Sequence, residues 1–173
     1  MKIIILILIF AAHSLDIFGQ CTSKVDEMTK EKIINTEVLK IGKAKLCGMC
    51  PKLFLSSSFM KIDSTFGLFL KAEGSSAWSI KENEIFYLKT ENDSVLKIIN
   101  RQYSISSITK GEAFTQGTNT IIFSLSISQK IDLNILQYLS TNKLVKIRVG
   151  IYDYEITKPE IIQEQIKCIM TTK

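Results

Sequence analysis

Apolar and polar residues alternate through much of the chain, as they do in strands that bury one face. The alternation begins near Thr36 and is clearest in STFGLFLKAEG, NTIIFSLSIS and KLVKIRVGIYDYEI. The residues predicted to face inward in these stretches are Phe66, Leu68, Leu70, Ala72, Ile121, Phe123, Leu125, Ile127, Val145, Ile147, Val149 and Ile151. The serines and lysines between them predict a sheet whose second face meets solvent.

A β-hairpin is predicted in EIFYLKTENDSVLKII. Two apolar segments of strand length flank ENDS, which begins at Glu91 and ends at Ser94. Asn, Asp and Ser favour turns because their short polar side chains bond to nearby backbone groups. We therefore expect two antiparallel strands joined at these four residues.

The segment DLNILQYLSTN has the helical period instead. Leucine recurs at every third residue, at Leu133, Leu136 and Leu139, and Asp132 precedes them in a capping position. A short helix at about 131–141 is therefore inserted between two late strands.

A second helix is predicted at the end of the chain, in TKPEIIQEQIKCIM. Thr157 and Glu160 have the spacing of a capping box, and Pro159 suits a first turn because its missing amide costs nothing there. An isoleucine stripe follows at Ile162, Ile166 and Ile169. We expect a helix at about 158–171 that packs on the sheet.

These elements predict a mainly β fold, because repeated strand-helix-strand order is missing. We expect an antiparallel β-sandwich or a curled sheet, with the short inserted helix and the C-terminal helix as cover. The order of segments over roughly residues 60–170 resembles small exported β-rich proteins of Bacteroidetes-type bacteria. That group has no assigned activity, so the resemblance implies a fold and no function.

The N-terminal segment has the parts of a secretory signal. Lys2 precedes the apolar run 3–12, which is shorter than the ~18 residues of a membrane span. We predict a signal peptide at 1–19, a polar lead-in at 20–35 that is flexible or a short helix, and a single β-rich domain at 36–173. Lipid attachment at Cys21 fits less well, because Gln20 stands where a small residue is required. The expected location is periplasmic or extracellular, with no transmembrane span after signal removal.

The one histidine of the chain, His13, lies in the predicted signal. A mature chain without imidazole excludes Ser-His and Cys-His nucleophile pairs and His-ligated zinc. No catalytic residue, metal or cofactor is therefore assigned, and a non-enzyme is favoured.

The formal net charge is +5 and is carried mostly by lysine, since Arg101 and Arg148 are the two arginines. Readout of phosphate or guanine favours arginine, and the lysines are scattered among acidic residues. We expect a solvated basic surface and no nucleic acid partner; a glycan or protein partner at the cell envelope stays open.

Four cysteines, Cys21, Cys47, Cys50 and Cys168, follow the predicted signal. Export favours disulfides, and four cysteines allow three pairings, all of which stay open here. The motif CGMC at Cys47 to Cys50 also resembles the thioredoxin-type redox pair, although the strand and proline context of that fold is missing. Structural disulfides are favoured, and thiol-disulfide redox activity is the alternative.

The aromatic residues Trp78, Tyr87, Tyr152 and Tyr154 are the remaining candidate site, because flat rings on a sheet face stack on sugars. The leading hypothesis is a non-enzymatic binding or accessory module of the periplasm or cell surface. A thiol-disulfide redox protein is the first alternative, and a carbohydrate-binding module is the second.

Overall fold

The computed structural model describes residues 21–44, 52–109, 114–115, 118–119 and 121–172. The elements in chain order are β1 (Cys21–Val25), β2 (Lys32–Thr36), β3 (Leu39–Ala44), β4 (Leu53–Ile62), β5 (Thr65–Gly74), β6 (Ser79–Ile80), β7 (Ile85–Thr90), β8 (Val95–Ile99), β9 (Ser104–Ile105), β10 (Ser107–Thr109), β11 (Phe114–Thr115), β12 (Thr118–Asn119), β13 (Ile122–Lys130), α2 (Leu133–Thr141), β14 (Leu144–Val149), β15 (Tyr152–Ile156) and α3 (Pro159–Thr171).

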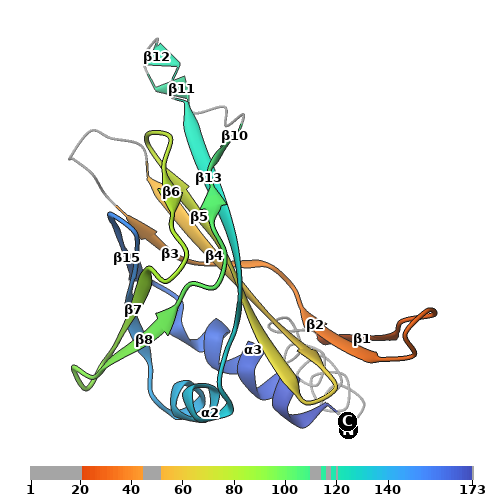
Figure 1. Ribbon diagram of the computed structural model, residues 1–173. Helices are drawn as coiled ribbons and strands as arrows, with labels where there is room; N and C mark the ends of the chain where they lie inside the picture. Colours follow the sequence, from red (N-terminus) through yellow and green to blue (C-terminus); the bar gives the residue numbers. More distant parts are fainter. Residues whose placement is uncertain (1–20, 45–51, 110–113, 116–117, 120, 173) are drawn as a thin grey trace, which may run out of the picture.

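One large antiparallel sheet dominates the molecule (Figure 1). Its strand order is β10-β13-β5-β4-β3-β15-β14-β7-β8, and β2 pairs with the other end of β4 while β1 pairs with β2. The short pairs β11-β12 and β6-β9 stand apart from it. The expected antiparallel, mainly β fold with a curled sheet and a C-terminal helix is therefore confirmed.

The inner face of the sheet is built as the alternation predicted. Leu55 of β4 lies opposite Ala72 of β5, which lies opposite Leu125 of β13, and all three are fully buried. Two residues further along, Leu70 and Ile127 form the next buried row. Burying such apolar side chains contributes roughly 1.5–3 kcal/mol each, so these rows stabilise the contacts among β4, β5 and β13.

The alternation misplaces three side chains because it ignores where strands stop and where they bulge. Val145 is 38% exposed near the start of β14, where the register with β7 shifts. Ile121 is 55% exposed just before β13 begins, and Ile151 is 80% exposed in the turn between β14 and β15. Gly150 in this turn has φ +57, a value that glycine adopts without strain. The single run KLVKIRVGIYDYEI is thus two paired strands with a tight turn between them.

The predicted lead-in is neither a flexible arm nor a helix where the structure describes it. β1 and β2 form a hairpin whose turn is held by Asp26, with its carboxylate accepting the amides of Met28 and Thr29 at 2.8 Å. These hydrogen bonds hold the pKa of Asp26 below its ordinary value. Polar residues dominate this hairpin because it projects from one side of the molecule, where β2 pairs with β4 (Figure 1).

The C-terminal helix α3 covers one part of the inner face. It buries Ile161, Ile162, Ile166 and Ile169 and packs on β4 and on α2. Pro159 occupies the first turn as predicted, but Lys158 is the N-cap and no side chain caps the helix. Thr157 instead donates its amide to the carbonyl of Ile41, which ties the start of α3 to β3.

A fully buried glutamine secures α3 to the sheet. The Gln165 amide donates to the carbonyls of Glu37 (2.8 Å) and Ser57 (3.1 Å), and its oxygen accepts the Ser57 hydroxyl at 2.9 Å. Glu37 lies in the break between β2 and β3, where the sheet ladder along β4 is interrupted. The side chain of Gln165 therefore satisfies a backbone carbonyl that the interrupted ladder leaves over.

The inserted helix and the predicted hairpin are both present. α2 begins after Asp132, which holds the N-cap position without a side-chain capping bond, and it buries Leu136 and Leu139 while Leu133 is 45% exposed. β7 and β8 pair in register around the predicted turn, and Asp93 adopts φ 63 there. No helix in the described part of the chain has the length and apolar character needed to cross a membrane.

Candidate functional site

The two ends of the curled sheet are linked by side chains beyond the last residue of β8. Gln129 of β13 donates its amide to the side-chain oxygen of Asn100 at 2.5 Å, and its own oxygen accepts the backbone amide of Arg101 at 2.9 Å. Asn100 is fully buried and also donates to the carbonyls of Lys81 and Gln102. This polar bridge holds β8 beside β13 without covering the space below it.

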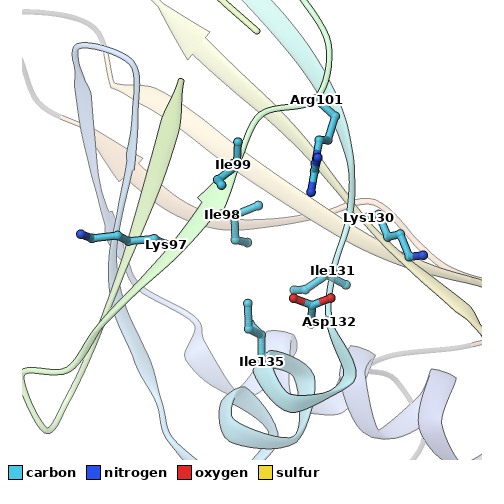
Figure 2. Close-up of a pocket in the computed structure, with 8 residues that line it drawn as sticks. All are labelled: Lys97, Ile98, Ile99, Arg101, Lys130, Ile131, Asp132 and Ile135. Atoms are coloured by element: carbon cyan, nitrogen blue, oxygen red, sulfur yellow. The ribbon is translucent and has the colours of Figure 1, made fainter. Parts of the chain in front are cut away.

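Below the bridge lies an opening of about 250 Å³ between β8, β13 and α2 (Figure 2). Three isoleucines line the opening. Ile98 of β8 is 5% exposed, Ile131 directly after β13 is 3% exposed, and Ile135 of α2 is half-buried. Apolar walls with a few polar groups at the rim are typical of small-ligand sites.

The rim of the opening is predominantly cationic. The charged residues of its lining are Arg101, Lys97 and Lys130 and one acidic residue, Asp132. The guanidinium of Arg101 points into the opening, whereas the two lysines extend away from it on opposite sides (Figure 2). Among the described residues, no carboxylate lies at ion-pair distance from Arg101. A cation of this kind, next to apolar walls, is suited to an anionic group attached to a small apolar one.

A second hollow, of about 190 Å³, lies on the outer face of β7 and β14, but two of the three cations in its lining already have ion-pair partners. Arg148 forms a bidentate ion pair with Asp153, at 2.5 Å and 2.8 Å, and Lys89 pairs with Asp93 at 2.7 Å. The hydrogen bond from each cation holds the pKa of its carboxylate below the ordinary value. A ligand would have to break these pairs, which makes this hollow the weaker candidate.

A third hollow, of about 310 Å³, lies on the outer face of β2, β4 and β5 and has no charged side chain in its lining. Its residues, such as Met60 and Phe69, form the half-buried outer surface of the sheet. Nothing in this hollow specifies a ligand, and the opening below the polar bridge is the stronger candidate site.

The four aromatic residues considered as a sugar platform do not share a surface. Trp78, Tyr152 and Tyr154 are 9%, 3% and 0% exposed, and the first two meet edge to face with ring centroids 4.9 Å apart. The Tyr154 hydroxyl donates to the carbonyl of Glu73, and burial raises the pKa of this phenol above its usual range. Tyr87 is 36% exposed and lies on the outer face opposite Arg148.

Two of the four candidate cysteines are joined. A disulfide links Cys21 of β1 to Cys168 of α3, with Cα atoms 6.0 Å apart. Cys47 and Cys50 lie outside the described residues, so the CGMC redox hypothesis stays a prediction. Because Cys21 and Cys168 are paired, any second disulfide among the four cysteines would have to join Cys47 to Cys50. No group of three or more His, Cys, Asp or Glu side chains in the described ranges is placed to hold a metal ion.

The residues of the opening were not singled out in the sequence. Arg101 was noted as one of two arginines, Ile98 lies in an ordinary predicted strand, and Ile131 falls at the start of the predicted inserted helix. The available signal was the position of Arg101 two residues beyond an apolar strand, in IINRQ. That signal is insufficient, because the sequence does not show that β8 is the last strand of its sheet.

No protein-family model matches the sequence, and neither a curated protein nor a solved structure matches it.

Proposed function

We propose that the protein is an exported, non-enzymatic binding module of the periplasm or cell surface, and that the opening between β8, β13 and α2 is its ligand site. The observation that carries this proposal is the guanidinium of Arg101, which points into an apolar opening without an ion-pair partner among the described residues. The ligand is expected to place an apolar group against Ile98, Ile131 and Ile135 and a carboxylate or similar anion near Arg101.

Export is supported by two features. The N-terminal segment has the charge and length of a secretory signal, and the Cys21–Cys168 disulfide is of the kind that persists in oxidising compartments. The disulfide joins the first strand to the last helix across a sequence separation of 147, as expected of a structural bond.

The simplest probe is octanoate, which combines a carboxylate with a short alkyl chain. We expect octanoate to shift the NMR signals of Arg101 and Ile135, and 1-octanol, which lacks the charge, to bind more weakly by about tenfold. Arg101→Glu should abolish the shifts at Ile135. Lys24→Glu, the same charge change in the exposed strand β1, should leave them intact.

The proposal is wrong if octanoate produces no saturable shift at the opening, or if Lys24→Glu weakens binding as much as Arg101→Glu does. In the second case the interaction reports the net charge of the molecule and not a site.

A further inference from the structure

The strand β8 is the last of its sheet, and hydrogen bonds at both ends of the β7-β8 hairpin reveal which of its backbone groups are free. Thr90 donates to the carbonyl of Ser94, and Asn100 donates to the carbonyl of Glu84. In an antiparallel ladder, every second residue exchanges bonds with its partner. The register therefore directs the backbone groups of Leu96 and Ile98 toward β7.

The backbone groups of the residues between them point the other way. Lys97 and Ile99 present their N–H and C=O groups to the free edge of β8, and the described residues offer them no partner. Arg101, two residues further on, has the same orientation, and its amide does find a partner in Gln129. The polar bridge therefore binds the backbone amide just beyond the end of β8, whereas the backbone groups of Lys97 and Ile99 within β8 remain available for hydrogen bonds.

Within the described residues, the strand β13 also has free backbone groups, on the side that faces β8 across the gap between the two strands, which we call the seam. Ile131 donates its amide to the carbonyl of Phe66, so the alternate residues of β13 bond to β5. Ser128 and Lys130 consequently direct their backbone groups away from β5, toward the seam. The curled sheet thus ends in two strand edges, with the apolar opening between them and Arg101 above it, beside the polar bridge (Figure 2).

We propose that the free edge of β8 binds an extended acidic peptide by adding it to the sheet as a further strand. This inference rests on the proposed function, because it names the ligand class of the same opening. Main-chain hydrogen bonds to Lys97 and Ile99 supply affinity, while alternate side chains supply specificity. Peptide side chains on the inner face of the sheet would enter the opening beside Ile98, and peptide side chains on the outer face would lie next to Lys97.

Charge and shape both favour this occupant over a neutral one. A lysine in the middle of an edge strand discourages pairing with another copy of the same edge, because like charges would lie close together. A glutamate on the added strand removes that repulsion and pairs with Lys97. Ile99 is 48% exposed and Val95 is 51% exposed on the same outer face, so an added strand also covers apolar surface.

The probe is the blocked pentapeptide EVEIE, in which glutamates and apolar residues alternate. Two N-methylated forms are compared with it: one carries N-methyl groups on the three glutamates, and the other carries them on the valine and the isoleucine. In a paired strand, alternate amides face β8, so one methylated form keeps every hydrogen bond to the edge and the other loses them. We expect one form to bind as EVEIE does and the other to bind at least about tenfold more weakly.

The charge-reversed peptide KVKIK and the variant Arg101→Glu complete the test. KVKIK should bind more weakly than EVEIE, and Arg101→Glu should weaken EVEIE, whereas Lys24→Glu should not. Equal binding of the two methylated forms, or no binding of EVEIE to the native protein, overturns strand addition. Octanoate distinguishes this failure from a failure of the proposed function. If octanoate still binds in an Arg101-dependent way, the ligand site is supported and only the peptide as its ligand is rejected.

Discussion

Two buried glutamines hold the sheet in two different ways. Gln165 makes three hydrogen bonds beneath α3, where the surrounding isoleucines are sealed from solvent. Gln129, 4% exposed, makes two bonds between β13 and the end of β8, directly above an opening. Both satisfy buried polar groups, but only the first is covered by a helix. The difference separates a part of the molecule built for stability from a part that leaves a strand edge available.

The covered part should dominate the stability of the fold. Apolar burial beneath α3, the Gln165 bonds and the Cys21–Cys168 disulfide all act on the same elements. The open part is not covered by α3, and the end of β8 is held to β13 by the polar bridge. Four changes test this contrast, in order of decreasing effect on the free energy of unfolding.

Removing the disulfide should have the largest effect. A closed loop of this length corresponds to about 5 kcal/mol in the chain-entropy model, which is an upper value for the loss in a Cys21→Ser/Cys168→Ser variant. Urea unfolding followed by circular dichroism measures the loss. An unchanged midpoint would show that the disulfide does not stabilise the covered part.

The next largest effect is expected of Gln165→Leu. The variant leaves the buried hydroxyl and carbonyl of Ser57 and the part-buried carbonyl of Glu37 without this partner, which should cost about 3 kcal/mol. Gln137→Leu, on the exposed face of α2, is the matched control and should stay within about 0.5 kcal/mol of the native protein. Equal effects of the two substitutions would mean that the Gln165 bonds contribute nothing specific.

Gln129→Leu should cost less, about 2 kcal/mol, because it leaves one buried acceptor, the side-chain oxygen of Asn100, without this partner, while the amide of Arg101 can bond to water at the strand edge. Its larger consequence should be local. Hydrogen exchange at the Arg101 amide should accelerate more than exchange in β4, as the end of β8 is released from β13. Uniform acceleration across the sheet would contradict a bridge that acts only at the seam.

The smallest effect concerns the exposed pair of Arg148 and Asp153. The hydrogen bond from Arg148 lowers the pKa of Asp153 below its ordinary value of 3.8, so the pair contributes stability above that pH and loses it as pH falls through the folded pKa. The Tm of the native protein should exceed that of Asp153→Asn slightly at neutral pH, and the gap should close below pH 3.8. A gap that persists in acid would have a cause other than this pair.

Much of the fold could be predicted from the sequence because period-two alternation records one buried face directly. Leu68, Leu70 and Ala72 were placed correctly for this reason, and so was the turn at Asp93. The errors occurred where alternation carries no information: Ile151 lies in a turn that the run of apolar residues conceals.

The candidate site could not be predicted, because it depends on strand order and not on local pattern. Nothing in VLKII distinguishes an edge strand from a central one, and the role of Gln129 depends on a residue of another strand. The alternation also did not show which aromatic residues are buried: Trp78 and Tyr154 lie in the core, and Tyr87 lies on the outer face.

Hydrogen exchange along β8 in the presence of EVEIE tests the central claim most directly. In the free protein, the amides of Lys97 and Ile99 point away from β7 and should exchange fast, whereas those of Leu96 and Ile98 should be protected. The account predicts that saturating EVEIE slows exchange at Lys97 and Ile99 and leaves Leu96 and Ile98 as they were. Unchanged exchange at Lys97 and Ile99 in the saturated complex would contradict it.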